Sequence, residues 1–572
     1  MMSKRIGARF PRGMKLFRPV TSIVGAVVVA AGLTVALVGF TTAAPRAAAA
    51  AAQSPPTCAP GTTVNTNDGP VCAVTANGVT SYLGIPYAAP PVGKLRWAPP
   101  APAIPWTTTL QATTSGNICP APGGSGTPVG NENCLNLNVQ VPAGTTARSN
   151  LPVMVEIHGG GFLSTAFNTV GDGTHMVTSG HVAWVAINYR LGILGFMALD
   201  GLGPHAGDYG LQDQEAALRW VQQNIVRFGG NPHNVTILGQ SAGGASVCLL
   251  TASPPARGLF AKGISESGFY NAAIGPQLVW EAADCKAQLP TEAQAQADGA
   301  AFAAKVGCGT TANQVACLRA VPVATLLKDA GGQISGSTAG GTIAPTINGT
   351  TLPMSPGKAF ATGHVNNVSL MIGVSRDEIN GGDSSPPAAA ATAAQYRALV
   401  EQKYGPLAPA VFRLYPPSRF PGSSPFIAFR TIVADSDSVC PALAADQQLA
   451  RRIPVYAYED DDADTPNFYL NPAFPNGAFH VAEGAFVLPV AGLTFDADQS
   501  ALAAQVTGEW TGYARTGDPT VAGTPLWTRY TSRNPMVMSL VPAGDSALDP
   551  ASTIAMQHNC GFWDAVTPVP SH

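Results

Sequence analysis

The sequence predicts an α/β protein in which helices pack on a mostly parallel central sheet. Three observations support this: short apolar runs rich in β-branched residues, an amphipathic helical segment between two of them, and a Gly-x-Ser-x-Gly turn directly after one run. Strand, helix, strand, turn and helix follow one another in that order. This βαβ order is typical of right-handed parallel connections.

The chain is organised around residues 234–253, NVTILGQSAGGASVCLLTAS. Val235, Ile237 and Leu238 predict a buried strand of a parallel sheet. A segment of small and apolar residues follows the turn and predicts a buried helix. A serine at the apex of such a strand–turn–helix unit is a candidate nucleophile.

The turn itself is GQSAG, residues 239–243, with Ser241 at its apex. A nucleophile there must clear the sheet on a strained turn, so close packing favours glycine, which has no Cβ, at Gly239 and Gly243. The N–H of Ala242 then lies at a helix N-terminus, where a developing oxyanion is stabilised.

An earlier strand, PVMVEI at residues 152–157, ends in a glycine turn formed by His158 and residues 159–161. Such a turn exposes backbone N–H groups that suit either an oxyanion or a phosphate. A phosphate loop needs G-x-G-x-x-G opening a helix, or a Lys-Ser/Thr pair after the glycines. Neither pattern is present, so the residues favour the oxyanion.

The next strand and its exit are predicted at residues 182–196, VAWVAINYRLGILGF. Residues 210–230 then predict an amphipathic helix that Gly229 ends. One side of this helix is apolar, with Leu211, Ala217, Leu218, Val221 and Ile225.

Three other segments have simpler patterns. The alternating runs around Val64 and Val71 predict a β-hairpin. The proline-rich residues 82–100 predict a surface segment without regular helix. Residues 134–142, CLNLNVQVP, predict a strand that leaves a Gly/Pro-rich loop.

Composition bounds the domain organisation and the partners. A length of 572 residues allows up to about four domains, but no linker, charge block or repeat divides the chain after its N-terminus. We therefore predict one domain over residues 56–572. A net charge of −3 with 11% charged residues leaves no basic stripe for nucleic acid, so no nucleic-acid partner is expected.

Residues 1–52 predict a signal peptide and a flexible Ala/Pro-rich lead-in. Basic residues up to Arg18 precede an apolar stretch from Val20 to Phe40, and small residues offer cleavage sites near Ala44 or further along the alanine run. The predicted location is secreted or extracytoplasmic, and no stable membrane partner is expected after cleavage. The stretch is long enough to span a bilayer, so an uncleaved membrane anchor is the alternative. Ten cysteines suit an oxidising compartment.

Five ordered blocks carry a family resemblance: ENCLNLNVQVP, PVMVEIHGGGF, NYRLGILGF, residues 207–236 and GQSAGGASV. Together they resemble the type-B carboxylesterase family of α/β-hydrolases, which includes bacterial para-nitrobenzyl esterases. The likeness is dense from Tyr82 to Gly268 and resumes at GVSRDE, GAFHVAE and WTGYARTGDP. It implies an α/β-hydrolase fold with helices on both faces of the sheet and large loop and helical insertions.

A base for the serine must follow it, because the chain order of the triad in this fold is Ser, acid, His. The histidines after Ser241 are His364, His480, His558 and His572. The family's histidine lies in a G-x-x-H-x-x-E motif, which residues 477–483 match at His480. His558 precedes Cys560 without such a motif.

The family's acid lies in a G-x-x-x-D-E-G turn, and residues 373–378, GVSRDE, place Glu378 there. This chain has Ile379 where the family usually has glycine. Asp377 is the rival acid.

The resemblance also assigns the oxyanion donors to the N–H groups of Gly160, Gly161 and Ala242. The residue before the nucleophile is often glutamate in this family, but here it is Gln240, so one negative charge near the imidazole is missing. A site that selects a cation would need that carboxylate. The alternative for Gln240 is that it merely holds a water or a backbone group.

The family's two loop-closing disulfides imply the pairs Cys119–Cys134 and Cys308–Cys317. The pairs Cys58–Cys72 and Cys440–Cys560 are weaker hypotheses. Cys248 is expected to be a small buried apolar residue rather than a reactive thiol. The pairing of Cys285 is left open.

These expectations combine into a secreted serine esterase with the triad Ser241, His480 and Glu378, acting through an acyl-enzyme on a small-molecule ester. No metal and no organic cofactor is expected. A lipase acting at interfaces shares the chemistry and differs in its lid and acyl pocket. A non-catalytic, adhesion-type relative would have a broken triad, whereas all three positions are filled here.

Overall fold

The computed structural model describes residues 57–123, 127–165, 171–268, 289–309, 313–330, 344–378, 392–466, 477–488 and 493–566. Its strands are β1 (Val64–Asn65), β2 (Pro70–Cys72), β3 (Val74–Ala76), β4 (Val79–Pro86), β5 (Leu110–Gln111), β6 (Asn136–Pro142), β7 (Leu151–Ile157), β8 (Ala183–Ile187), β9 (Gly230–Gln240), β10 (Lys262–Glu266), β11 (Ser369–Ser375), β12 (Val455–Asp460), β13 (Met536–Leu540) and β14 (Ala547–Pro550). Its helices are α1 (Thr174–Gly180), α2 (Gly192–Phe196), α3 (Tyr209–Asn224), α4 (Ala242–Ala252), α5 (Glu292–Lys305), α6 (Gln314–Ala320), α7 (Val323–Ala330), α8 (Pro356–Thr362), α9 (Ala393–Tyr404), α10 (Ala408–Leu414), α11 (Pro425–Ala434), α12 (Cys440–Leu449), α13 (Ala482–Val487), α14 (Ala497–Thr516), α15 (Ala551–Gln557) and α16 (Cys560–Val566).

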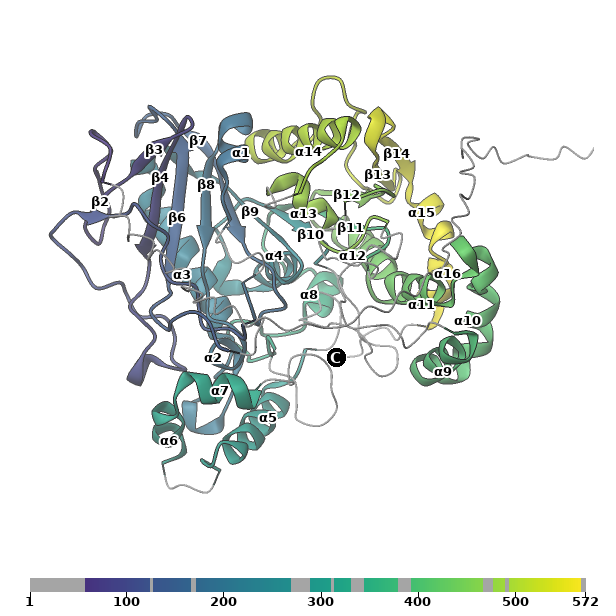
Figure 1. Cartoon of the computed structure of the whole chain (residues 1–572), viewed down its shortest axis with the longest axis horizontal. Coiled ribbons are helices and arrows are strands. Elements are labelled where there is room, and N and C mark those ends of the chain that lie inside the picture. Colours follow the sequence, from purple (N-terminus) through teal and green to yellow (C-terminus); the bar gives the residue numbers. More distant parts are fainter. Residues whose placement is uncertain are drawn as a thin grey trace, which may run out of the picture. The chain divides into compact units, whose positions relative to one another are not determined.

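Eleven of the described strands form one sheet, in the order β14-β13-β12-β11-β10-β9-β7-β8-β6-β4-β3 (Figure 1). All neighbours from β8 through β7, β9, β10, β11 and β12 to β13 are parallel. The strands β3, β4 and β6 at one edge and β14 at the other pair antiparallel. The predicted mostly parallel central sheet is therefore confirmed. The hairpin predicted around Val64 and Val71 is the antiparallel pair of β1 and β2, in a separate three-stranded sheet with β5.

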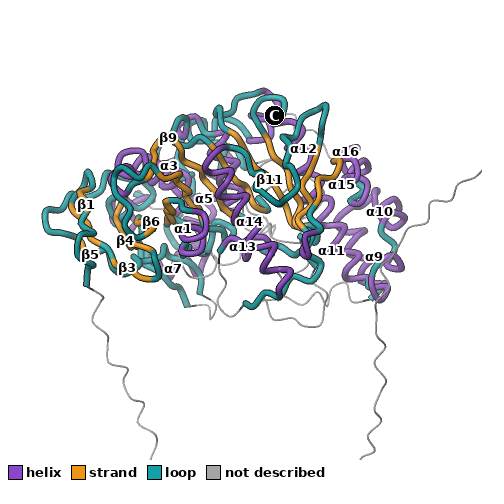
Figure 2. Tube along the Cα trace, turned by 90° about the horizontal axis from the view of Figure 1, so that it is seen from above, coloured by secondary structure: helices purple, strands orange, loops and turns teal. Residues whose placement is uncertain are grey.

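Alternation along the central strands divides the core between the two faces of the sheet. On β7, Val153 and Val155 join a hydrophobic cluster that includes residues of α3 and α4, whereas Met154 joins a cluster that includes residues of α14. Successive strand residues point to opposite faces, so these clusters lie on opposite sides. Figure 2 shows helices on both sides of the strands. This is the arrangement that the family resemblance implies.

The helix predicted after β8 is α3. Its five apolar positions are fully buried, and the α-helix ends at Asn224 in a short 3₁₀ turn, Ile225–Phe228. Gly229 then adopts a left-handed conformation with a φ of 84°, which stops the helix as predicted.

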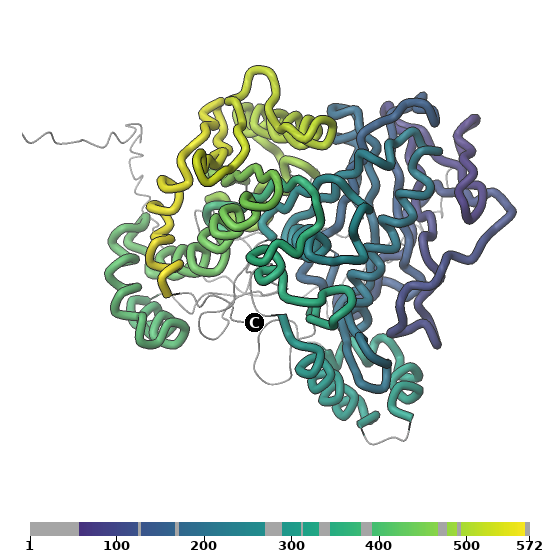
Figure 3. Tube along the Cα trace, turned by 180° about the vertical axis from the view of Figure 1, so that it is seen from behind, coloured from purple at the N-terminus to yellow at the C-terminus, as the bar shows by residue number. Residues whose placement is uncertain are grey.

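The large insertions are helical. Helices α5, α6 and α7 enclose one small hydrophobic cluster, and α9, α10, α11 and α16 gather around another that contains Trp563. Figure 3 shows α9, α10 and α11, in green, beside the C-terminal helices, in yellow. Among the described residues, no helix is both long enough and apolar enough to cross a membrane. The signal peptide predicted within residues 1–52 lies outside the described residues.

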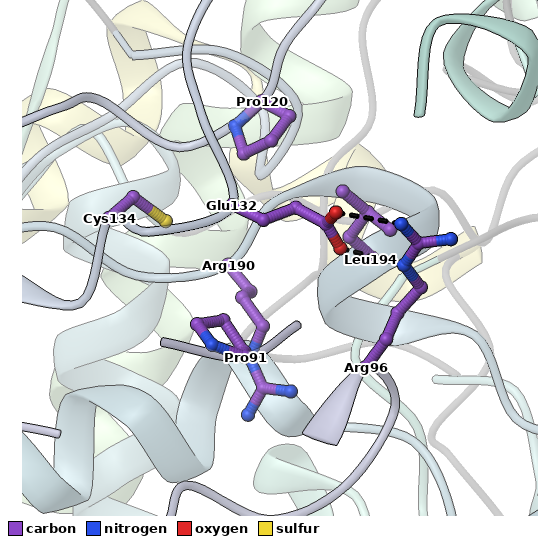
Figure 4. Close-up of a pocket in the computed structure, with 7 residues that line it drawn as sticks. All are labelled: Pro91, Arg96, Pro120, Glu132, Cys134, Arg190 and Leu194. Carbon is purple, nitrogen blue, oxygen red and sulfur yellow. Dashed lines mark hydrogen bonds and ion pairs between the residues drawn. The ribbon is translucent and has the colours of Figure 1, made fainter. Parts of the chain in front are cut away.

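The proline-rich residues 82–100 are not the surface segment that their composition predicts. They hold no α-helix, as expected, but Ile85 and Trp97 are at most 1% exposed. The indole N–H of Trp97 donates to a backbone carbonyl of α2, and the guanidinium of Arg96 pairs with Glu132 through two contacts of 2.7 Å. Figure 4 shows this pair at the wall of a small cavity beside Arg190. Tertiary partners, which composition does not show, account for the burial.

Candidate active site

The turn between β9 and α4 carries Ser241 in a strained conformation. Its φ of 60° and ψ of −124° lie outside the usual regions for a residue with a side chain. The N–H of Ser241 donates to the carbonyl of Glu266 at the end of β10, 2.9 Å away. Because β9 lies between β7 and β10, the serine stands at the carboxyl edge of the parallel part of the sheet.

The glycines on either side of this serine are required by close packing. A Cβ on Gly243 would overlap the carbonyl of Ile157, and one on Gly239 would lie 2.6 Å from the carbonyl carbon of Gly243. A Cβ on Gly159 would lie 3.2 Å from the Cβ of Ser241, so the glycine turn after β7 passes directly beside the serine. The packing reason predicted for Gly239 and Gly243 is confirmed.

His480 bridges Ser241 and Glu378. Its Nε2 lies 2.9 Å from the Oγ of Ser241, and its Nδ1 lies 2.5 Å from Oε1 of Glu378. Glu378 is fully buried, whereas about a quarter of the His480 side chain is exposed. A hydroxyl next to an imidazole that a carboxylate orients is an arrangement that can act as a nucleophile.

A second layer of polar residues holds Glu378. Its Oε2 accepts hydrogen bonds from the Oγ of Ser267 at 3.0 Å and from the N–H of Ser375 at 3.2 Å. The hydroxyl of Ser375 also donates to Glu483. Burial, together with the charge of Glu378, raises the pKa of Glu483 well above its usual range.

No functional role was predicted from the sequence for Ser267, Ser375 or Glu483. Glu483 carries one signal, because it ends the G-x-x-H-x-x-E motif three residues after His480. The two serines lie at the ends of β10 and β11, which are neighbours only in the folded sheet. Short-range spacing therefore could not reveal them.

The competing histidines lie elsewhere. His558 is buried, with its Nδ1 2.6 Å from Asp435 and its Nε2 3.0 Å from Glu459. These carboxylates raise the pKa of His558 to about 10 against the opposing effect of burial. His364 is exposed and contacts Thr362. His572 lies outside the described residues.

The rival acid, Asp377, contacts the histidine loop at its backbone. Its Oδ2 accepts from the N–H of Ala478 at 3.2 Å. Glu378, in contrast, contacts the imidazole itself.

The three predicted oxyanion donors lie on the two turns that meet at Ser241. Gly160 and Gly161 have φ values of 108° and 64°, which glycine adopts without steric cost. Ala242 is the first residue of α4, so its N–H has no acceptor within the helix.

The side chain of His158 contacts both the glycine turn and Tyr189. Its Nδ1 lies 2.8 Å from the carbonyl of Gly159, and its ring stacks on Tyr189 with 4.4 Å between centroids. Burial lowers the pKa of His158 to about 4, so the ring is neutral at physiological pH. A neutral ring with its proton on Nδ1 donates to that carbonyl and adds no charge near the site.

Gln240 lies against the imidazole of His480. Its amide nitrogen is 3.4 Å from both Nδ1 and Nε2. The glutamine therefore lies beside the histidine at the position where the family resemblance leads us to expect a carboxylate, and it brings no negative charge.

Four disulfides join described cysteines: Cys58–Cys72, Cys119–Cys134, Cys308–Cys317 and Cys440–Cys560. They include both pairs that the resemblance implies and both weaker hypotheses. Cys248 is fully buried on α4, as expected, but it is disulfide-bonded rather than a free thiol. The sequence leaves the pairing of Cys248 open, and the expectation of a buried residue rather than a reactive thiol is confirmed. Within the described residues, no group of three or more His, Cys, Asp or Glu side chains could hold a metal ion.

A parallel sheet covered by helices on both faces, with a serine on a sharp strand–helix turn, is the α/β-hydrolase fold. Comparison with known proteins agrees. The family described as the carboxylesterase family matches residues 61–563. A solved structure described as a PNB esterase aligns with a TM-score of 0.70 at 32% identity, covering 87% of this chain and 99% of that chain.

Curated relatives give the same result. The para-nitrobenzyl esterase of Bacillus subtilis (strain 168) is 35% identical over 480 residues, which are 80% of this chain and 90% of the relative. The cocaine esterase of Homo sapiens is 32% identical, covering 86% of this chain and 88% of the relative. The acetylcholinesterase of Bungarus fasciatus is 30% identical, covering 86% and 83%. The chain therefore belongs to the carboxylesterase family, and it is a carboxylic-ester hydrolase.

Proposed function

We propose that this protein is a secreted serine esterase whose catalytic triad is Ser241, His480 and Glu378. The observation that carries the proposal is the unbroken chain of contacts from the serine hydroxyl through both ring nitrogens to the buried carboxylate, at 2.9 and 2.5 Å. The strained conformation of Ser241 at the strand–helix turn supports it further.

In the proposed mechanism, the Oγ of Ser241 attacks the ester carbonyl while Nε2 of His480 takes its proton. The N–H groups of Gly160, Gly161 and Ala242 stabilise the oxyanion of the tetrahedral intermediate. His480 then protonates the leaving alcohol, and the same imidazole activates the water that hydrolyses the acyl-enzyme. Throughout, Glu378 fixes the tautomer by accepting from Nδ1–H and stabilises the imidazolium that forms.

The proposed substrates are neutral esters with short or medium acyl chains. Two features support the preference for a neutral group: Gln240 stands in place of a carboxylate beside His480, and the Cys119–Cys134 loop has no aromatic residue in its sequence, ICPAPGGSGTPVGNENC. The acyl preference follows from the family relationship.

Covalent labelling tests the nucleophile. A fluorophosphonate probe should label the folded protein, and peptide mapping should place the adduct on Ser241. Ser241→Ala should abolish labelling, whereas Ser179→Ala, at an exposed serine, should not change it. An unlabelled wild-type protein, or an adduct on another serine, would show that the assigned mechanism is wrong.

We propose export for the mature protein because the basic and apolar N-terminal residues resemble a signal peptide and disulfides join eight described cysteines. N-terminal sequencing of exported protein should begin after the apolar stretch. Non-reducing peptide mapping should recover Cys119 linked to Cys134 and Cys308 linked to Cys317. Exported protein with these four cysteines as free thiols would refute both the pairing and the compartment.

A further inference from the structure

Besides the contact between the His480 ring and the Glu378 carboxylate, three hydrogen bonds between described residues join the turn that carries Glu378 to the loop that carries His480. Two of them connect backbone groups: Asp377 N–H donates to the carbonyl of Ala478 at 2.8 Å, and His480 N–H donates to the carbonyl of Glu378 at 3.0 Å. The third uses a side chain, because Oδ2 of Asp377 accepts from the N–H of Ala478 at 3.2 Å. Asp377 therefore takes part in two of these three bonds.

The backbone of the histidine loop lies close to the carboxylate of Asp377 at Gly477. Gly477 has a φ of 62°, and a Cβ at this position would overlap the side chain of Asp377. The next two residues, Ala478 and Phe479, are fully buried. The loop thus passes beside Asp377 at Gly477, is buried at Ala478 and Phe479, and is partly exposed again at His480.

Two positive charges near Asp377, those of Arg376 and His558, oppose the effect of burial on its carboxyl group. Arg376 is next to it in sequence, but its guanidinium makes a two-oxygen contact with Asp461, at 2.9 Å to each oxygen. His558, held between its own two carboxylates, contributes a second positive charge. Burial raises the pKa of Asp377 to about 6, and the negative charge of Asp461 acts in the same direction. The positive charges of Arg376 and His558 lower the pKa and partly offset this rise. At neutral pH the group is mainly ionised.

We propose that Asp377 is a positioning residue, whose carboxylate holds the backbone of the histidine loop so that the imidazole of His480 stays between Glu378 and Ser241. The inference rests on the proposed triad and adds a residue to it. The 2.9 and 2.5 Å contacts of the imidazole require that the loop stay in place, and a misplacement of about 1 Å can cost roughly 100-fold in rate. Asp377 itself does not contact the reacting atoms in this arrangement.

The test compares two replacements of Asp377. Asp377→Ala removes the acceptor and should lower kcat by about 10-fold or more, with KM nearly unchanged, because the loop loosens without altering substrate contacts. Asp377→Asn keeps an oxygen that accepts from Ala478 and should restore most of kcat. Asp545→Ala, at an exposed aspartate, is the matched control and should behave as wild type.

The outcomes separate the inference from the proposed function. A folded Asp377→Ala protein with wild-type kcat overturns the positioning role, and labelling of its Ser241 would leave the proposed triad intact. Equal, severe losses in Asp377→Asn and Glu378→Gln would make Asp377 the acid and also overturn it. Should Asp377→Ala not fold, Gly477→Ala tests the same contact from the loop side, and normal kcat there counts against the proposal. Failure of the wild type to label at Ser241 instead rejects the proposed function.

Discussion

Ser241 and His480 are expected to act as one unit, because the hydroxyl becomes a strong nucleophile only as the imidazole takes its proton. Ser241→Ala and His480→Ala should each lower kcat by on the order of 10³-fold or more, and the double variant should lose little further. Glu378→Gln should be less damaging but still severe. Turnover of a chromogenic ester measures all four proteins. Losses that multiply in the double variant would mean that the two residues act independently.

Gln240 gives a second prediction at the residue scale, about charge in the substrate. Gln240 brings no carboxylate to the position before the nucleophile, and the Cys119–Cys134 loop has no aromatic residue to offer a cation–π contact, which is worth about 2 kcal/mol, or roughly thirtyfold in affinity. The ratio of kcat/KM for acetylcholine to that for 3,3-dimethylbutyl acetate should be near or below one. Gln240→Glu should raise this ratio. A tenfold preference for the cation in the wild type would reveal a choline site built from other residues.

Strand β7 and helix α4 pack so closely at Gly243 that a side chain there has no room. Gly243→Ala would drive a methyl group into the carbonyl of Ile157, so β7 or α4 must shift, and both stability and labelling of Ser241 should fall. Gly508→Ala is the matched control in α14, because its Cβ would meet Val521 at an ordinary 3.7 Å. It should raise the free energy of unfolding by about 0.5–1 kcal/mol, since alanine favours helix over glycine. Thermal unfolding and probe labelling measure both variants, and a stable, reactive Gly243→Ala protein would contradict the packing argument.

At the element scale, helices and strands could be predicted from the sequence where the spacing of apolar residues and the residues at the ends of the segment indicated the same element. The strand and helix around residues 234–253 and the apolar side of α3 follow from patterns within a few turns of chain. The burial of Trp97 and Arg96 did not follow, because it depends on α2 and on Glu132, which are distant in sequence. Proline content excludes a helix, but it does not decide whether an extended segment lies inside or outside.

The candidate site shows the same division. The positions of Ser241, Glu378 and His480 come from three local motifs, and their catalytic roles remain predictions. Ser267 and Ser375 meet at the acid because β10 and β11 are neighbours in the sheet, and Glu483 contacts Ser375 from α13. The contact between Gln240 and the imidazole likewise requires the fold.

Buried carboxyl groups should make the stability of the whole molecule depend on pH. Burial raises the pKa of Glu266 from 4.5 to about 7, although its Oε1 accepts from the indole of Trp510 at 2.5 Å. The folded state therefore keeps a proton that the unfolded state releases, and stability falls as pH rises from about 4.5 to about 7. This group alone should cost about 2 kcal/mol between pH 5.5 and 8.5.

Unfolding by denaturant at these two pH values measures the effect. Glu266→Gln keeps an acceptor for Trp510 and does not titrate, so the pH dependence should shrink by that amount. Glu401→Gln, at an exposed glutamate, is the control. An unchanged pH dependence in Glu266→Gln would mean that Glu266 does not hold its proton in the folded protein.

The order of the strands has a consequence for synthesis. His480 comes late in a chain of 572 residues and follows β12, whereas Ser241 directly follows β9. On the proposed function, a nascent chain presents its serine long before the base that activates it exists, and no fragment ending before residue 480 can hydrolyse an ester. If the chain is exported unfolded, as the proposed secretion implies, Ser241 and His480 come together only after the chain has crossed the membrane.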